Sequence, residues 1–228
     1  MNSYTQTFLI KFNETISFNE IPAFRGAIIK LIDNPSLLFH NHIDDDSVRY
    51  SYPLIQYKRI NGKAAIFCIS EGITAIGNLL SMPNYNIDIS SRSINLSINK
   101  IVPQRHLIQI WDSCFNYRIR NWLPLNSKNY QQFCQIEELS SQIAFLEKIL
   151  IGNILSFAKG IGVEINKDIV CKLIAINGKK LLTAKSIKMM AFDIEFKINV
   201  SLPDFIGLGK HSSIGFGTTV RNYEKNKI

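Results

Sequence analysis

Residues 48–70, "VRYSYPLIQYKRINGKAAIFCIS", decide the fold class of this chain. They hold two runs rich in aromatic and apolar residues, "VRYSYPLIQYKRI" and "KAAIFCIS", which are separated only by Asn61-Gly62. Asn-Gly between two such runs is the strongest short sign of a β-hairpin, because both residues of its type I′ turn need positive φ. We therefore predict two antiparallel strands joined by a tight turn.

The residues before this hairpin predict a strand and then a helix. "YTQTFLIKF" (4–12) alternates between apolar and polar side chains, as a half-buried strand does. "NEIPAFRGAIIKLID" (19–33) has apolar residues at helical spacing. Asn19 can cap this helix, and Asn34-Pro35 would end it.

The residues after the hairpin predict a second helix and a further strand. "EGITAIGNLL" (71–80) has the pattern of a short helix, and "NYNIDISSRSINLSINKIV" (84–102) alternates as one long strand would. The resulting order, strand–helix–strand–strand–helix–strand, is that of the ferredoxin-like unit. We expect this unit to end near residue 102.

The second half of the chain repeats the same order with one change. A strand is predicted within 106–123, helical structure over 127–162, and a final long strand over 189–202. Asn177-Gly178 lies where a second hairpin turn would fall. A glycine-rich loop, residues 207–217, stands where the second helix would be. We expect an α+β protein of two tandem ferredoxin-like (RRM-like) domains, 1–102 and 103–228, the second modified by this loop.

Composition limits the classes of function. The chain has 228 residues, 46% of them hydrophobic, which is enough for a real core. It lacks a run of about 18 uncharged apolar residues, so we expect a cytoplasmic protein without a membrane segment. The four cysteines form no CxxC pair, and no cluster of acidic residues demands a cation. We therefore expect neither metal nor cofactor.

Positive charge is concentrated in the second half. Residues 1–102 carry 9 Lys and Arg against 8 Asp and Glu, a net charge of +1, whereas residues 103–228 carry 17 against 10, a net charge of +7. A basic bias confined to one domain favours a polyanionic partner such as nucleic acid.

The stretch "GLGKHSSIGFGTTVR", residues 207–221, holds four of the chain's 12 glycines together with two cations, Lys210 and Arg221. Neither nucleotide-binding motif fits it, because the third glycine of GxGxxG is replaced by Ser212 and the GxxxxGK[ST] spacing is absent. A glycine-rich loop that crosses a basic ferredoxin-like sheet would instead let an RNA backbone lie close to the protein.

This loop, with the "LP" that precedes it, resembles the C-terminal loop of the CRISPR repeat-processing endoribonucleases. "HNH" (40–42), "RYSYPLIQYKRINGKAAI" and "EKILIGNILSFAKGI" are similar to that family as well. The resemblance implies tandem ferredoxin-like domains and cleavage of the CRISPR precursor RNA within each repeat. It also implies RNA as the partner, with a CRISPR effector complex and a homodimer as further options.

Such cleavage uses the 2′-OH of the RNA as nucleophile and leaves a 2′,3′-cyclic phosphate, so it needs a base, an acid and a donor for the developing charge rather than a metal. His40 and His42 lie in "LLFHNHIDDDS" (37–47), which we name the histidine loop and where the family commonly carries a catalytic histidine. Either can be the acid or base, and we favour His42. Lys58 would stabilise the phosphorane, and Tyr52 would donate a proton or stack on a base.

Other residues are expected to hold the RNA. They are Gly207, Gly209, Lys210, His211, Gly215, Gly217 and Arg221 of the glycine-rich segment, together with Arg118 and Arg120, which share one face of a strand. An alternative function needs the same residues: a non-catalytic subunit that binds the repeat or crRNA within an effector complex. The presence of both loop histidines favours the enzyme.

Overall fold

The computed structural model describes residues 4–32, 38–39, 52–184 and 187–222. The chain divides into two compact units, Met1–Leu107 with Ser213–Gly215, and Ile108–Ser212 with Phe216–Ile228. The division falls between Leu107 and Ile108 rather than at residue 102, because the last strand of the first unit remains paired as far as His106.

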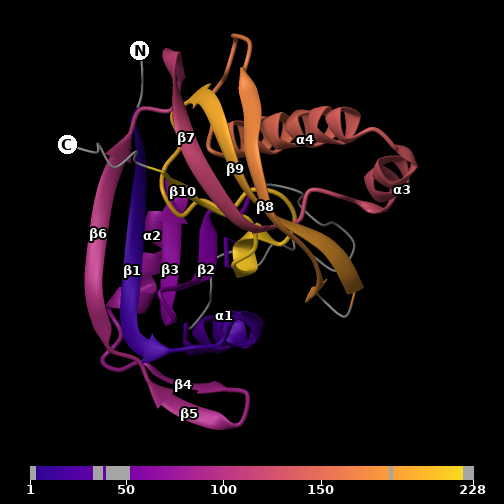
Figure 1. Cartoon of the computed structure of the whole chain (residues 1–228). Helices are drawn as coiled ribbons and strands as arrows, with labels where there is room; N and C mark the ends of the chain where they lie inside the picture. Colours follow the sequence, from indigo (N-terminus) through magenta and orange to yellow (C-terminus); the bar gives the residue numbers. More distant parts are fainter. Residues whose placement is uncertain (1–3, 33–37, 40–51, 185–186, 223–228) are drawn as a thin grey trace, which may run out of the picture. The chain divides into compact units, whose positions relative to one another are not determined.

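The first unit has a four-stranded antiparallel sheet in the order β2-β3-β1-β6 (Figure 1). With its strands numbered along the chain, this is the 4-1-3-2 order of a ferredoxin-like sheet, and two helices follow its first and third strands. The elements are β1 Thr5–Thr15, η1 Phe18–Glu20, α1 Ile21–Leu31, β2 Ile55–Ile60, β3 Lys63–Ile69, α2 Glu71–Leu80, β4 Asn86–Ile89, β5 Arg92–Asn95 and β6 Ile98–His106.

The predicted hairpin is confirmed. β2 and β3 pair from Ile60↔Lys63 outward, and the turn residues Asn61 and Gly62 have φ of 51° and 83°. These are the two positive φ values that a type I′ turn requires.

Residues 84–102 do not form the single strand that we predicted. They form the small β4–β5 hairpin, which turns at Ser90 with φ of 57°, and then β6. The alternating pattern was correct, but Ile87 and Ile89 are buried by packing of this hairpin beside α1 and not by the main sheet. The pattern alone does not say which partner a strand has.

The start of α1 also differs from the prediction that Asn19 caps it. Ser17 and Glu20 form a capping box around η1, and α1 follows at Ile21 with Pro22 in its first turn. The Glu20 carboxylate accepts the backbone N–H of Ser17 at 2.7 Å, and this bond is the main reason that the pKa of Glu20 is lowered.

The second unit repeats the sheet order, β10-β7-β9-β8, which is again 4-1-3-2. The glycine-rich loop and the short η2 connect its last two strands in place of a long helix, as the sequence predicted. The elements are β7 Ile110–Trp122, α3 Ser127–Gln135, α4 Leu139–Gly160, β8 Cys171–Ala184, β9 Ile187–Val200, η2 Ser212–Ile214 and β10 Thr218–Arg221. The fold class is therefore two tandem ferredoxin-like domains.

Asn177-Gly178 is not a hairpin turn, contrary to our prediction. β8 continues through both residues and stays paired with β9 from Cys171↔Ile198 to Ala184↔Ile187. The register shifts between Ile176 and Gly178, so the Asn-Gly pair marks a bulge within the strand.

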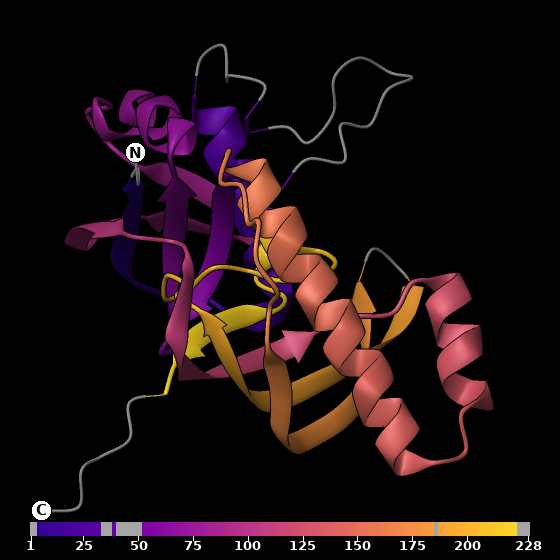
Figure 2. The same cartoon turned by 90° about the horizontal axis from the view of Figure 1, so that it is seen from above.

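The helix α4 covers one face of this sheet (Figure 2). Its buried residues include Leu146, Leu150, Ile154 and Phe157, and Asn153 accepts a hydrogen bond from Nε1 of Trp122 at 2.9 Å. Within the described residues, α4 is also the one helix with the length and hydropathy of a membrane span. Its buried face is that of a core helix.

Candidate functional site

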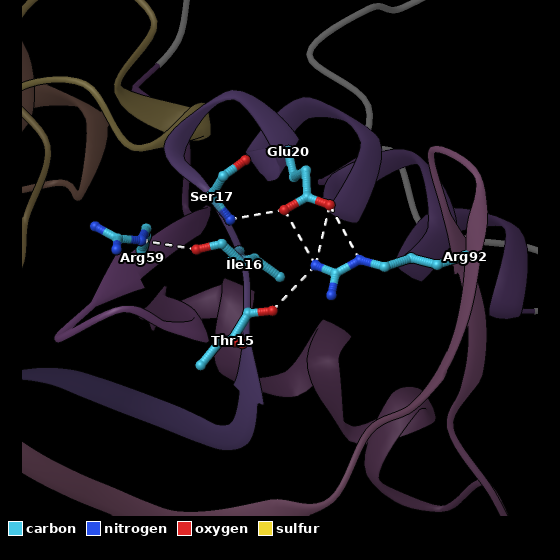
Figure 3. A network of polar contacts seen from close by, with 6 residues as sticks. All are labelled: Thr15, Ile16, Ser17, Glu20, Arg59 and Arg92. Carbon is cyan, nitrogen blue, oxygen red and sulfur yellow. Dashed lines mark hydrogen bonds and ion pairs between the residues drawn. The ribbon is translucent and has the colours of Figure 1, made fainter.

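Two arginines fix the corner between β1 and α1 (Figure 3). Arg92 of β5 donates to the two carboxylate oxygens of Glu20, at 3.2 and 3.1 Å, and to the carbonyl of Thr15 at 3.1 Å. Arg59 of β2 donates to the carbonyl of Ile16 at 2.7 Å. Because these bonds satisfy the carbonyls where β1 ends, they set the direction in which α1 leaves the sheet.

The helix α1 in turn holds the residue that precedes the candidate histidines. Nη2 of Arg25 donates to the carbonyl of Phe39 at 3.0 Å, and the Phe39 side chain is buried. His40 and His42 follow directly and lie outside the described residues. The structure therefore defines the point from which the HNH segment begins.

Tyr52 lies where the described chain resumes after the histidine loop. Its side chain is buried, and its hydroxyl accepts a hydrogen bond from Nε2 of Gln56 at 2.8 Å. The same amide also donates to the carbonyl of Pro53 at 3.0 Å. Tyr52 is thus held by a buried polar side chain, and a phenolic hydroxyl can both accept and donate a hydrogen bond.

Lys58 is fully buried on β2, with an exposed fraction of 0%. Burial lowers the pKa of its amine from 10.5 to about 7. A lysine with this pKa changes its charge near neutral pH, whereas an ordinary lysine stays charged. We expected Lys58 to stabilise the phosphorane, and the structure places its side chain in the interior of the first unit.

Tyr57, next to Lys58, has a buried hydroxyl that finds no hydrogen-bond partner among the described residues. Its ring packs edge-on against Phe24, with centroids 5.7 Å apart. Burial raises the pKa of Tyr57, and the positive charge of Arg25 opposes this effect. The hydroxyl therefore lies near the arginine that holds Phe39.

Two glycines of the glycine-rich loop are required by the backbone conformation of the loop itself. Gly209 and Gly217 have φ of 85° and 63°, a region that residues with a Cβ rarely adopt. A Cβ on Gly217 would collide with the carbonyl of Leu208, and one on Gly209 would stand 2.9 Å from the indole ring of Trp122. Larger residues at these two positions would displace the loop.

The middle of the loop reaches the surface. Lys210 is exposed and His211 partly so, while Gly207 is buried. The backbone N–H of Lys210 donates to the carbonyl of Leu123 at 3.1 Å, and the His211 ring lies 6.1 Å from that of Phe216. The backbone is fixed, so the Lys210 ammonium is presented from a rigid base.

Gly215 groups with the first unit and covers part of its edge strand β2. A Cβ added there would lie 2.6 Å from Cδ1 of Ile21 and 3.6 Å from the carbonyl of Tyr57. Covering an edge strand with a loop hides its backbone from solvent. This close approach helps to bury the strand that carries Lys58.

Three arginines expected to bind RNA lie on the sheet of the second unit. Arg118 and Arg120 of β7 are exposed, and their guanidinium groups take part in no hydrogen bond or ion pair within the described residues, although Arg118 stands opposite Glu195 of β9. The guanidinium of Arg221 lies over the ring of Phe115, 4.4 Å from its centroid, and its backbone N–H donates to Asp204 at 2.6 Å. Arg118 and Arg120 are thus the pair ready to receive an anion.

Two lysines of the same unit are already paired. Nζ of Lys172 lies 3.1 Å from a carboxylate oxygen of Glu147, and Nζ of Lys180 lies 2.8 Å from one of Asp193. Both lysines count toward the positive charge of the second half of the chain. Their pairing leaves less free positive charge at these positions than composition suggests.

Family models of two domains together match nearly the whole chain. The Cas6b N-terminal domain matches residues 3–106, and the Cas6b C-terminal domain matches residues 109–222. The chain belongs to the Cas6b family. The two matches meet at the division between the units, and they confirm the resemblance to CRISPR repeat-processing endoribonucleases.

Two solved structures and a curated protein are similar to this chain. A crystal structure of Cas6b has 28% identity and a TM-score of 0.88, and the match covers 96% of this chain and all of that one. A CRISPR RNA processing endoribonuclease Cas6b has 24% identity and a TM-score of 0.73 over the same shares. An uncharacterized protein of Methanocaldococcus jannaschii, MJ0978, is 33% identical over 103 residues, 45% of this chain and 69% of that protein.

Sequence analysis of this Cas6b chain did not mark two residues near the site. Arg25 lies within the predicted helix 19–33 and Tyr57 within the predicted hairpin 48–70, and neither was assigned a role. The signal that could have identified Arg25 was its position, a basic residue on the helix just before the histidine loop. Nothing in the pattern distinguished Tyr57 from other buried aromatic residues.

Proposed function

We propose that this chain cleaves CRISPR precursor RNA within its repeats, without a metal ion, to give mature crRNA. The observation that carries the proposal is the match of both domains to Cas6b, a family in which one similar solved structure is that of a CRISPR RNA processing endoribonuclease. The RNA supplies the nucleophile: its 2′-oxygen attacks the adjacent phosphorus, the 5′-oxygen leaves, and a 2′,3′-cyclic phosphate remains.

His40 and His42 carry the proton transfers in this proposal. One removes the 2′ proton and the other protonates the 5′-oxygen, because histidine is the side chain that titrates near neutral pH without perturbation. Support comes from the anchoring of the residue before them, since the Arg25 bond to the Phe39 carbonyl limits how far the chain can shift there. Tyr52, held by Gln56, is the additional proton donor.

Lys58 contributes charge in this proposal. Its exposed fraction of 0% means that a contact with the scissile phosphate would require the covering side chains to move when RNA binds. Without such a contact, Lys58 can still stabilise the developing negative charge through its own positive charge, because charges interact over longer range in an interior of low dielectric than in water. With a pKa of about 7, that charge is present below neutral pH and lost above it.

The substrate is held by phosphate contacts. Lys210 projects from the rigid glycine-rich loop, and Arg118 and Arg120 are exposed and unpaired within the described residues. The remaining loop positions that we predicted, Gly207, Gly209, His211, Gly215 and Gly217, shape the backbone around Lys210, and Arg221 adds a cation beside Phe115. Each phosphate contact releases a counterion, so affinity should fall steeply with salt.

The test is cleavage of a labelled repeat RNA in EDTA and in magnesium, with an RNA that carries a single 2′-deoxy nucleotide before the cut as control. The proposal predicts equal cleavage in both buffers, a cyclic phosphate product, and no cleavage of the 2′-deoxy RNA despite normal binding. Cleavage only in magnesium would refute the metal-free mechanism. Tight binding without cleavage in either buffer would replace the enzyme with the alternative, a crRNA-binding subunit of an effector complex.

A further inference from the structure

Trp111 is a tryptophan at the surface of the second unit. The chain has two tryptophans, and Trp122 is fully buried, whereas 38% of Trp111 is exposed. The register of β7 against β9 shifts between Ile110 and Phe115, so Trp111 lies in a stretch of β7 that leaves the regular ladder. A single exposed apolar side chain needs no explanation, so the neighbours of this indole decide what it can do.

A hydrogen bond and a ring contact fix the indole in one orientation. Nε1 of Trp111 donates to Oγ of Ser201 at 2.9 Å, so the polar edge of the ring already has a partner. The Phe115 ring packs edge-on against the indole, with centroids 6.3 Å apart and 85° between the ring planes. The exposed part of Trp111 therefore offers a ligand its π surface and not its N–H group.

Arg221 adds a second flat group to this cluster. Its guanidinium lies over the half-buried Phe115 ring, 4.4 Å from the centroid, and its backbone N–H donates to Asp204 at 2.6 Å. Phe115 thus contacts an indole and a guanidinium, the two kinds of planar surface on which unpaired RNA bases stack. We name Trp111, Phe115 and Arg221 the aromatic platform.

The charges beside the platform favour a base over a phosphate. Asp204 accepts the backbone N–H of Arg221, and the exposed Asp112 follows Trp111 directly in the chain. Because these two carboxylates offset the positive charge of Arg221, a phosphate would gain little here. A base is uncharged and binds through its π face, so the carboxylates do not oppose its stacking.

The platform lies at a distance from the phosphate contact expected at the glycine-rich loop. Arg221 stands opposite Tyr117 in the register of β10 and β7, whereas the backbone N–H of Lys210 is held by the carbonyl of Leu123, just beyond the other end of β7. Tyr117 and Leu123 are six positions apart, which is about 20 Å along a strand. An RNA that contacts both Lys210 and the platform must therefore span several nucleotides.

We propose that the aromatic platform binds one unpaired base of the RNA by stacking on Trp111, beside the Arg221 guanidinium. The inference rests on the proposed function only in taking RNA as the ligand. An exposed indole could also contact a protein, but the cation stacked beside the rings and the net charge of +7 over residues 103–228 favour RNA. The platform should discriminate little between bases, because every base has a π face.

The experiment follows tryptophan fluorescence while a 2′-O-methyl octaadenylate, which lacks the nucleophile and cannot be cleaved, is added. Stacking of adenine on the exposed indole should quench the wild-type signal. Trp111→Phe, which keeps the buried Trp122, should lose this quenching but retain most of the affinity. Trp111→Ala should weaken binding by about tenfold or more. Tyr130→Ala, which removes an aromatic side chain that is 43% exposed on α3, is the matched control.

Two further readouts separate stacking from charge. Trp111→Ala should leave the slope of affinity against salt unchanged, because stacking releases no counterion. Arg221→Lys keeps the positive charge but loses the planar guanidinium, so it should also weaken binding of the octaadenylate. An abasic octamer with the same backbone should bind to wild type and to Trp111→Ala equally.

The outcomes separate this inference from the proposed function. Wild-type fluorescence that stays constant while the octaadenylate binds, or a Trp111→Ala affinity equal to that of Tyr130→Ala, would overturn the stacking contact and favour a protein partner for the indole. Binding and quenching without cleavage of repeat RNA would support the platform and refute the proposed cleavage. Failure to bind any RNA, in a protein whose melting curve is normal, would overturn both.

Discussion

Replacing Lys58 with methionine should change how the stability of the protein depends on pH. Burial lowers the pKa of Lys58 from 10.5 to about 7. Between those values the unfolded chain holds a proton that the folded chain releases, so the free energy of unfolding of the wild type rises with pH across this window. The full lowering corresponds to about 5 kcal/mol, and the part realised between pH 6 and pH 9 to roughly half of that.

The assay is urea unfolding at 25 °C, followed by circular dichroism at pH 6 and pH 9. The free energy of unfolding of Lys58→Met should exceed that of wild type most at pH 6. The difference should shrink by roughly 2–3 kcal/mol at pH 9, because the folded wild-type lysine is then neutral. Lys63→Met, an exposed position on the same hairpin, is the control and should show no such change. Parallel behaviour of Lys58→Met and wild type at both pH values would refute the burial of a titrating amine.

Three further substitutions have outcomes that can be predicted from the structure. Arg25→Ala removes the bond to the Phe39 carbonyl and should slow single-turnover cleavage by roughly 10–100-fold with RNA affinity unchanged; weaker binding instead would contradict a positioning role. Lys210→Glu should weaken repeat RNA binding by about tenfold or more, most strongly at low salt, as measured by a salt titration. Gly217→Ala forces a Cβ against the Leu208 carbonyl at positive φ and should lower the free energy of unfolding by at least about 2 kcal/mol, which a melting curve would detect.

Most of the fold could be predicted from the sequence because the residues that decide it act through their own backbone conformation. Asn61-Gly62 needs only its own two dihedrals to form the turn, and the order of strands and helices around it limits the topology to the one observed. The same dipeptide at Asn177-Gly178 misled the prediction, because pairing with β9 on both sides overrides the local preference for a turn.

The candidate site was less predictable because burial depends on distant segments. As a charged residue in an alternating strand, Lys58 would be expected at the surface, yet its side chain is buried. Gly215, which lies more than a hundred residues further along the chain, packs on the backbone of the same strand. The loop glycines were read as room for RNA, whereas Gly209 and Gly217 are required by the loop itself. Charge counts likewise could not show that Lys172 and Lys180 are paired with carboxylates.

The central claim is metal-free cleavage by the histidine loop, and one measurement tests it most directly. Single-turnover cleavage of repeat RNA is followed in EDTA for wild type, His40→Ala, His42→Ala and the double variant, with RNA binding measured in parallel. The account predicts that loss of the acid or base slows cleavage by roughly 10²–10⁴-fold while binding persists. A double variant that cleaves at the wild-type rate would contradict it.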